Sequence, residues 1–492
     1  MSTGLDVAAE RGPGSARTFF GHPMGLANLA GVEMWERFSF YGMQGILVYY
    51  LYYSVTEGGL GLPETSATSI VGAYGGLVYL SAIVGAWVAD RLFGAEHTLL
   101  VAAVVIMVGH LSLALIPGLA GVGVGLLCIA LGSGALKTTT SSVLGDLYTR
   151  EDPRRDAGFS IYYMGVNLGA LFGPLLTGLL WNMKGFHWGF GLAALGMAAG
   201  LIQYLALRRR TLGDVGHQVV NPLDRRGKVR YGAIVAGVVL LVVVLSLTGV
   251  ITARRLSAIV IGITVAATIA LFWVLLSSHE ISAVEHSRVV SFIPMFIASA
   301  VFWSLFQQQS TVIALYADQR LNRSIFGWTM PPSWVQSINP IFIIIFAGVF
   351  ASVWTRLGDR QPTTPVKFAM GTIFMGIAFL LFLPFSGGGP NSTPLLWLVL
   401  ILFFFTMAEL FLSPVGQSLS TKLAPAAFHT QMIALYFLSI AVGTATAGTL
   451  AGFYDPAHET PYFLLIGGAS IGVGLLQLFG RRWISLRMGG VR

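Results

Sequence analysis

The segment AGVEMWERFSFYGMQGILVYYL, residues 30–51, decides the fold because it combines the length of a membrane-spanning helix with three charged residues. Glu33, Glu36 and Arg37 are separated by one to four positions, so a helix places all three on one face. Each such charge at the centre of a spanning helix costs ~3 kcal/mol unless it pairs or meets water. The segment therefore predicts a proton or substrate pathway. The alternative is a fixed ionic clasp that only orients helices.

The composition is that of an integral membrane protein with many helices. Of the 492 residues, 55% are hydrophobic and only 10% are charged, whereas soluble domains carry about 25% charged residues. This excludes a soluble enzyme, and because no nucleophile is paired with a base, no intramembrane enzyme is expected either. Cys128 is the single cysteine, which excludes an intrachain disulfide and a thiolate zinc cluster. No cofactor is predicted, and protons are the expected coupling ion.

Fourteen apolar stretches are long enough to cross about 30 Å of hydrocarbon. They lie near 24–53, 66–89, 98–117, 121–148, 157–181, 186–207, 231–250, 256–276, 289–316, 333–355, 366–385, 394–420, 427–453 and 461–480. An even number places both termini on one side of the membrane. Most of the 29 Lys and Arg residues fall in segments on that side, so both termini are predicted to be cytoplasmic. The net charge of +8 then reflects topology, and no nucleic acid partner is expected.

An Asp-Arg pair follows a helix in each half of the chain, Asp90 with Arg91 and Asp359 with Arg360. Ordinary loop anchors are one interpretation of these pairs. As a trace of internal repetition they favour two six-helix bundles, the design of one large class of transporters. The predicted divisions are a cytoplasmic tail (1–23), an N-terminal bundle (24–207), a basic cytoplasmic linker (208–230), two additional transmembrane helices (231–276), a C-terminal bundle (277–480) and a cytoplasmic tail (481–492).

Four further polar residues interrupt apolar helices: Lys137, Asn167, Asn339 and Glu409. A substrate that carries both an ammonium and a carboxylate group suits this set. Lys137 and Arg37 can receive the carboxylate, and Glu409 in the other bundle can receive the ammonium. Protons enter through the acids, because burial favours a neutral carboxyl group whereas a nearby cation favours the charged form.

Aromatic and amide side chains suitable for lining a cavity lie on the same helix face and in other helices: Phe40, Tyr41, Gln44, Tyr79 and Trp303. Ring faces and hydroxyl groups can hold substrate side chains of varied kind. For each of these residues, ordinary helix packing or an interfacial aromatic belt is the alternative interpretation.

With these residues the chain resembles the proton-dependent oligopeptide transporters of the major facilitator superfamily. The family's first-helix signature, Glu-x-x-Glu-Arg-Phe-x-Tyr-Tyr-Gly, is matched at residues 33–42 except that Phe40 replaces the first Tyr. The resemblance continues in GSGALK (132–137), FSIYYMGVNLG (159–169), SWVQSINP (333–340) and AELFLSPVGQSLSTKLAP (408–425). It implies an all-α major facilitator fold with two extra helices between the bundles, and proton symport of di- and tripeptides by alternating access.

The resemblance also implies a role for each site residue. Glu33, Glu36, Arg37 and Lys137 would couple protons, and Lys137 would link that network to the peptide carboxylate. Glu409 would hold the amino end of the peptide together with two asparagines. The implied peptide site comprises Arg37, Phe40, Tyr41, Gln44, Tyr79, Lys137, Asn167, Trp303, Gln307, Asn339, Glu409, Ser413 and Tyr436.

Two departures from the family pattern bear on mechanism. Gln307 stands where relatives usually carry an acid, and an amide takes up no proton. Glu33 and Glu36, with a neighbour such as Asp318, are therefore expected to carry the coupling. Gln44 stands where an Arg is common, which bears on peptide preference.

The expected function is import of di- and tripeptides across the bacterial cytoplasmic (inner) membrane, coupled to protons, by a chain that works as a monomer. Its partners are short peptides, protons and the lipid bilayer. One alternative keeps the fold and the proton coupling but moves nitrate, a drug or another small metabolite. Another is a peptide receptor that does not transport, although the sequence offers no soluble effector domain.

Overall fold

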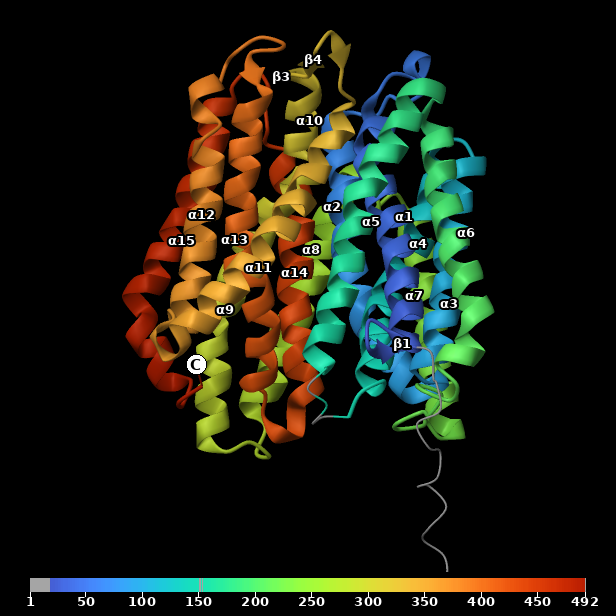
Figure 1. Ribbon diagram of the computed structural model, residues 1–492, viewed down its shortest axis with the longest axis vertical. Coiled ribbons are helices and arrows are strands. Elements are labelled where there is room, and N and C mark those ends of the chain that lie inside the picture. The colour runs from blue at the N-terminus through green and yellow to red at the C-terminus, as the bar shows by residue number, and fades with distance from the viewer. Residues whose placement is uncertain (1–17, 150–151, 153, 492) are drawn as a thin grey trace, which may run out of the picture.

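The computed structural model describes residues 18–149, 152 and 154–491 and is almost entirely helical (Figure 1). The helices are α1 (Met24–Tyr52), α2 (Glu64–Val88), α3 (Ala95–Leu115), α4 (Gly118–Asp146), α5 (Arg155–Lys184), α6 (Phe186–Thr211), α7 (Arg225–Leu247), α8 (Leu256–Ser277), α9 (Ala283–Phe306), α10 (Val312–Gln319), α11 (Ile338–Leu357), α12 (Thr364–Leu380), α13 (Leu395–Lys422), α14 (His429–Ala451) and α15 (Glu459–Arg487).

Strands are confined to short connections. Six two-residue strands pair as β1 (Thr18–Phe19) with β2 (His22–Pro23), β3 (Leu321–Asn322) with β6 (Thr393–Pro394), and β4 (Ser324–Ile325) with β5 (Trp328–Thr329). The first pair falls in the predicted tail 1–23, of which residues 1–17 lie outside the described part of the chain.

Thirteen helical segments of the described chain are long and apolar enough to cross a membrane. One of them runs from Ala283 to Gln319 and includes both α9 and α10. The remaining long helix is α1, whose three charges lower its hydropathy. Together these are fourteen long helical segments, as the sequence predicts.

Helix contacts divide the molecule into two bundles. In the N-terminal bundle, α1 packs against α5 and α6, and α3 packs against α4 and α6. In the C-terminal bundle, α12 packs against α13 and α15. The bundles meet where α2 packs along α14. Below, the terminal face is the end at which α1 begins and α15 ends, at the bottom of Figure 1, and the opposite face is the other end.

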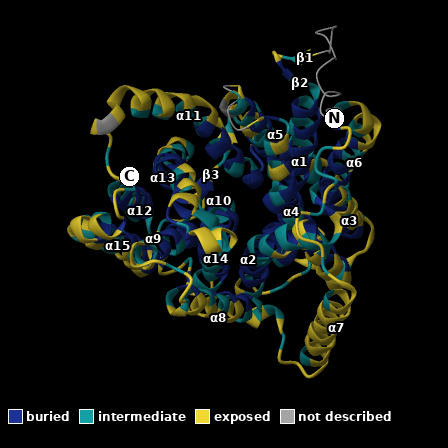
Figure 2. Cartoon of the chain, turned by 90° about the horizontal axis from the view of Figure 1, so that it is seen from below, coloured by how far each residue is buried: buried dark blue, intermediate teal, exposed yellow. Residues whose placement is uncertain are grey.

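The helices between the bundles differ from each other in burial. None of the residues of α7 is buried, and Figure 2 shows this helix as exposed along its length. In contrast, α8 packs against α2 and α14. After its basic first six residues, 225–230, α7 is apolar and exposed, which is compatible with contact to lipid.

The span predicted at 289–316 is interrupted. α9 ends at Phe306, a 3₁₀ turn η4 (Gln307–Ser310) follows, and α10 begins after Thr311. Backbone that leaves the α-helix at membrane depth must find partners within the protein. Here the Thr311 N–H donates to the backbone oxygen of Gln308 at 3.1 Å, and the buried Gln308 side chain accepts a hydrogen bond from the Tyr462 hydroxyl at 2.7 Å. The periodicity of the sequence carries no mark of this break.

Candidate functional site

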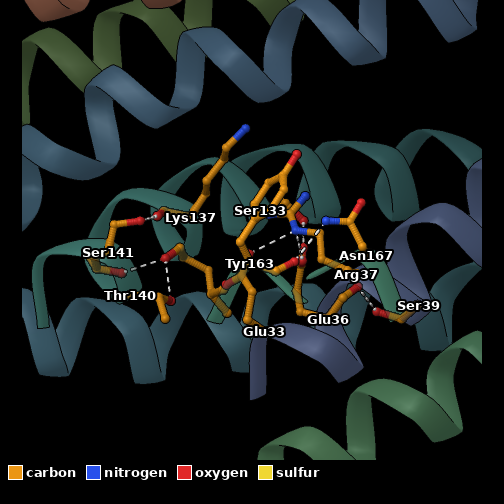
Figure 3. Close-up of polar contacts among 12 residues, drawn as sticks. Glu33, Glu36, Arg37, Ser39, Ser133, Lys137, Thr140, Ser141, Tyr163 and Asn167 are labelled. Carbon is orange, nitrogen blue, oxygen red and sulfur yellow. Dashed lines mark hydrogen bonds and ion pairs between the residues drawn. The ribbon is translucent and has the colours of Figure 1, made fainter. Parts of the chain in front are cut away.

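The three charges of α1 form one buried ion cluster (Figure 3). Arg37 Nε lies 2.9 Å from Glu33 Oε1 and also 2.9 Å from Glu36 Oε2. All three side chains are 5% exposed or less. Two carboxylates therefore share one guanidinium group, so the cluster carries an excess negative charge when both acids are ionised.

Ser133 of α4 completes this cluster. Its hydroxyl donates to Glu36 Oε1 at 2.6 Å, a short bond of the kind expected for a charged acceptor. Arg37 Nη2 is buried and has no hydrogen-bond partner among the described residues. Its guanidinium carbon lies 5.4 Å from the Phe40 ring centroid. Arg37 thus retains a donor that a further acceptor can use.

Lys137 does not join the ion cluster. It lies one helical turn from Ser133 on α4, and its side chain points away from Glu33 and Glu36 (Figure 3). Its ammonium lies 4.7 Å from the ring centroid of Tyr79 on α2. Within the described part of the chain it makes no ion pair. The Tyr79 ring in turn lies 6.4 Å from that of Trp303 in the C-terminal bundle, so the lysine stands close to the bundle interface.

The C-terminal bundle contributes an acid without a cation. Asn339 Nδ2 donates to Glu409 Oε2 at 3.2 Å and to Thr406 Oγ1 at 3.1 Å. Among the described residues, Glu409 makes no ion pair. Nearby, the Tyr436 hydroxyl donates to the backbone oxygen of Ser413 at 3.2 Å.

The remaining predicted site residues have separate environments. Asn167 Nδ2 donates to the backbone oxygen of Tyr163 at 2.8 Å, so no hydrogen bond joins it to Asn339 or Glu409. Gln44 is 4% exposed within α1. Gln307 lies against α2 of the N-terminal bundle. Its Nε2 atom is 3.7 Å from the position that a Cβ atom on Gly75 of α2 would occupy.

Tyr41 connects the two charged regions. It interacts electrostatically with both Arg37 of α1 and Glu409 of α13. Tyr79 of α2 interacts electrostatically with the same two residues. The predicted residues therefore converge from both bundles on one region, although they form no continuous hydrogen-bond network.

Hydrogen bonds across the bundle interface lie toward the opposite face. Asp318, at the end of α10, accepts hydrogen bonds from the hydroxyl groups of Tyr52 and Tyr53, which extend from the end of α1. Gln319 Nε2 donates to Glu64 Oε1 at 2.8 Å, and Trp334 Nε1 donates to the backbone of α5 at 2.9 Å.

The backbones of α2 and α14 also meet in this half of the molecule. A Cβ atom on Gly72 would lie 2.5 Å from the Cα atom of Gly448. Three further side-chain hydrogen bonds join the bundles, from Tyr49 to the backbone of α10 and from Ser333 and Ser337 to the backbone of α5. Among the described residues, these hydrogen bonds join the bundles from the opposite face down to the middle of α5.

Sequence reasoning missed Ser133, Tyr52 and Tyr53. A signal for Ser133 was present, because it precedes Lys137 by four residues and so shares its helix face. The two tyrosines resemble interfacial anchors, and nothing in their local sequence indicates that they cross to Asp318.

Comparison with known proteins identifies relatives along nearly the whole chain. A family model described as the POT family matches residues 96–466. The chain is 43% identical over 474 residues to YclF, an uncharacterized transporter of Bacillus subtilis, with 96% of each protein covered. It is 40% identical over 492 residues to a di-/tripeptide transporter of Lactococcus lactis subsp. cremoris, covering 97% of this chain and 98% of that relative.

Solved structures also match nearly the whole chain. A crystal structure of a peptide transporter POT in complex with sulfate has 47% sequence identity and a TM-score of 0.92, covering 96% of this chain and 97% of the other. A POT family transporter in complex with 5-aminolevulinic acid has 40% identity and a TM-score of 0.90, with 95% and 98% covered. The all-helical major facilitator fold predicted from the sequence is thereby confirmed.

Proposed function

The chain belongs to the POT family of multi-pass membrane transporters, and from this membership we propose that it is a proton-coupled symporter that imports di- and tripeptides by alternating access. It is a transporter and not an enzyme. The charged residues of the site support both the peptide cargo and the proton coupling.

One observation carries the proposal: the N-terminal bundle holds cationic donors, and the C-terminal bundle holds a carboxylate that makes no ion pair among the described residues. On the N-terminal side, Arg37 has an unused buried Nη2 and Lys137 makes no ion pair among the described residues. On the C-terminal side, the carboxylate of Glu409 is held by the amide of Asn339, which is a neutral donor. A short peptide carries a carboxylate at one end and an ammonium at the other, so it can satisfy both sides at once.

Proton coupling follows from competition for cations. Glu33 and Glu36 share the guanidinium group of Arg37. When a peptide carboxylate binds Arg37 or Lys137, the two acids lose part of this stabilisation. One of them then takes up a proton, because two adjacent buried carboxylates cannot both stay charged without a cation. Peptide binding and protonation therefore favour each other.

Alternating access requires the hydrogen bonds at the opposite face to open. Three consecutive arginines, Arg208 to Arg210, end α6 at the terminal face, which by the positive-inside rule is the cytoplasmic one. The described conformation is then closed to the outside. Opening the contacts of Tyr52, Tyr53 and Asp318 would admit substrate from the outside.

The proposal leaves the exact zwitterion to experiment. One matched transporter holds 5-aminolevulinic acid, which like a peptide has an amino group and an acid group. The same pair of charged regions would accept either compound. Nitrate has no ammonium group, so its transport would leave Glu409 without a role.

Uptake by purified protein in liposomes tests the proposal. An inward proton gradient should drive accumulation of a labelled dipeptide, and unlabelled dipeptides and tripeptides should compete, whereas free nitrate should not. When a protonophore collapses the gradient, the labelled dipeptide should only equilibrate across the membrane and should no longer accumulate. Accumulation that is unaffected by the protonophore would refute proton coupling, and competition by nitrate without competition by peptides would refute the cargo.

A further inference from the structure

The terminal face carries a cluster of two imidazoles and one carboxylate that the transport site does not use. Glu96 lies in the first turn of α3 and is 1% exposed. His97 follows it, and His217 lies in the linker between α6 and α7. One ligand atom from each residue can be chosen so that all three lie within 4.8 Å of one another.

The separations approach those of a tetrahedral metal site. Glu96 Oε2 lies 3.3 Å from His217 Nε2 and 3.8 Å from His97 Nδ1. With metal-ligand bonds of ~2.0–2.1 Å, two ligands of a tetrahedral Zn²⁺ ion are ~3.3 Å apart. The first pair meets this distance. The second needs a small side-chain rotation, which His97 can make because its side chain is 52% exposed.

The linker is already docked so that it presents His217. Glu96 N donates to the backbone oxygen of Gly216 at 3.0 Å, and Asn221 N donates to that of Asp90 at 2.9 Å. Gly216 has φ +76°, a left-handed conformation that glycine adopts without strain. These bonds fix the backbone on both sides of His217, so the three ligand residues are already close together before a metal ion binds.

Two neighbouring side chains orient the carboxylate. Glu96 Oε1 accepts a hydrogen bond from the Tyr204 hydroxyl at 2.8 Å, and Arg208 contacts both oxygens, with Nε 2.9 Å from Oε1 and Nη2 3.0 Å from Oε2. Hydrogen-bonded ligating carboxylates of this kind are usual at metal sites. The positive charge of Arg208 opposes a second cation, so it moderates the affinity. His217 Nδ1 has no hydrogen-bond partner among the described residues, so it is available to carry the ring proton when Nε2 binds a metal.

We propose that Glu96, His97 and His217 bind a Zn²⁺ ion, with water as the fourth ligand, and that the ion ties the linker to the start of α3. Two imidazole nitrogens and one carboxylate oxygen suit Zn²⁺, whereas Mg²⁺ prefers oxygen ligands alone. The half-exposed ring of His97 leaves the ion a path from solvent. The site is independent of the transport proposal.

Calorimetric titration of ZnCl₂ into the purified full-length chain tests the proposal, after removal of any polyhistidine tag and of chelators. We expect one Zn²⁺ per chain and no binding of MgCl₂. His217→Ala and His97→Gln should each weaken Zn²⁺ binding at least ~tenfold, which is the effect that even second-shell changes reach at metal sites. His279→Ala is the matched control, because this residue is exposed on another loop of the terminal face.

A thermal melt in the absence of metal verifies that each variant is folded. Zn²⁺ should raise the melting temperature of the wild type and of His279→Ala, and raise it less in the two ligand variants. Arg208→Gln should bind Zn²⁺ more tightly than the wild type, provided that its metal-free melt shows a folded protein. Equal Zn²⁺ affinity in the wild type, His97→Gln and His217→Ala would overturn the proposal.

Discussion

Substitution of Tyr53 by Phe should shift the protein toward a conformation that is open at the opposite face. The Tyr53 hydroxyl lies 2.9 Å and 3.0 Å from the two carboxylate oxygens of Asp318. Tyr53 belongs to the N-terminal bundle and Asp318 to the C-terminal bundle. The bond is therefore made only while these ends of the bundles are together, and its loss destabilises the closed conformation alone.

The size of the effect follows from the geometry. Tyr53 has a single O–H group, so its two short distances represent one shared hydrogen bond. A hydrogen bond to a charged group contributes about 1.5–3 kcal/mol. The Tyr53 side chain is partly exposed and that of Asp318 is 12% exposed, so water can replace part of the interaction after opening, which favours the lower end of the range. A change of about 1.4 kcal/mol is tenfold in an equilibrium constant, so the ratio of open to closed molecules should rise roughly tenfold.

Electron paramagnetic resonance can measure this ratio. Cys128 is the only native cysteine, so Cys128→Ser gives a background for two spin labels. Labels at Val55 and Phe326 would sit on exposed connections of the two bundles at the opposite face. In Tyr53→Phe the population with the longer label separation should increase. Tyr50→Phe is the matched control, because the Tyr50 hydroxyl bonds the Gly118 backbone within the same bundle.

Asp318→Asn extends the test, because it removes the charge that both Tyr52 and Tyr53 bind. Its shift toward the open population should exceed that of Tyr53→Phe. Distance distributions in Tyr53→Phe and Asp318→Asn that match those of the control would refute the assignment of this contact as an interbundle latch.

Four further predictions concern coupling and packing. Glu36→Gln should abolish proton-driven peptide accumulation but retain counterflow exchange in liposomes, and accumulation equal to the wild type would contradict its coupling role. Lys137→Ala should likewise lose concentrative uptake of peptide. Gln307→Glu places an acid at position 307 that can bind a further proton, so it should raise the proton-to-peptide ratio measured from the reversal potential. Gly72→Ala should lower the free energy of unfolding by about 1–3 kcal/mol, because the added Cβ atom would lie 2.5 Å from the backbone of α14. Gly191→Ala should have little effect, since nothing lies within 4 Å of a Cβ there.

Local spacing explains why the ion cluster could be predicted from the sequence. Glu33, Glu36 and Arg37 lie on adjacent turns of one helix, so helical geometry alone brings them together. Ser133 comes from α4, and its bond to Glu36 depends on how α1 and α4 pack. Periodicity contains no information about that packing. The partner of Glu36 could therefore not be predicted from α1 itself.

The orientation of Lys137 illustrates the same limit. The family resemblance implies that Lys137 couples protons together with the acids of α1. In the structure its ammonium instead lies over the Tyr79 ring. About one helical turn along α4 separates Ser133 from Lys137, and this displacement of about 6 Å decides which residue reaches Glu36. Sequence reasoning finds which buried charges must be explained, but tertiary packing decides how they pair.

Charge balance also bears on how coupling can proceed without an acid at position 307. Arg37 and Lys137 supply two positive charges, whereas Glu33, Glu36 and Glu409 supply three negative charges when ionised. In the empty protein the two cations can neutralise only two of these acids. A peptide adds no net charge, but its carboxylate occupies a cation while its ammonium neutralises Glu409. One acid is unneutralised both before and after the peptide binds, but binding moves this excess negative charge from Glu409 to the adjacent carboxylates of α1, and leaving a buried carboxylate there unpaired would cost several kcal/mol. We therefore expect Glu33 or Glu36 to take up one proton per peptide, in which case coupling needs no acid at position 307.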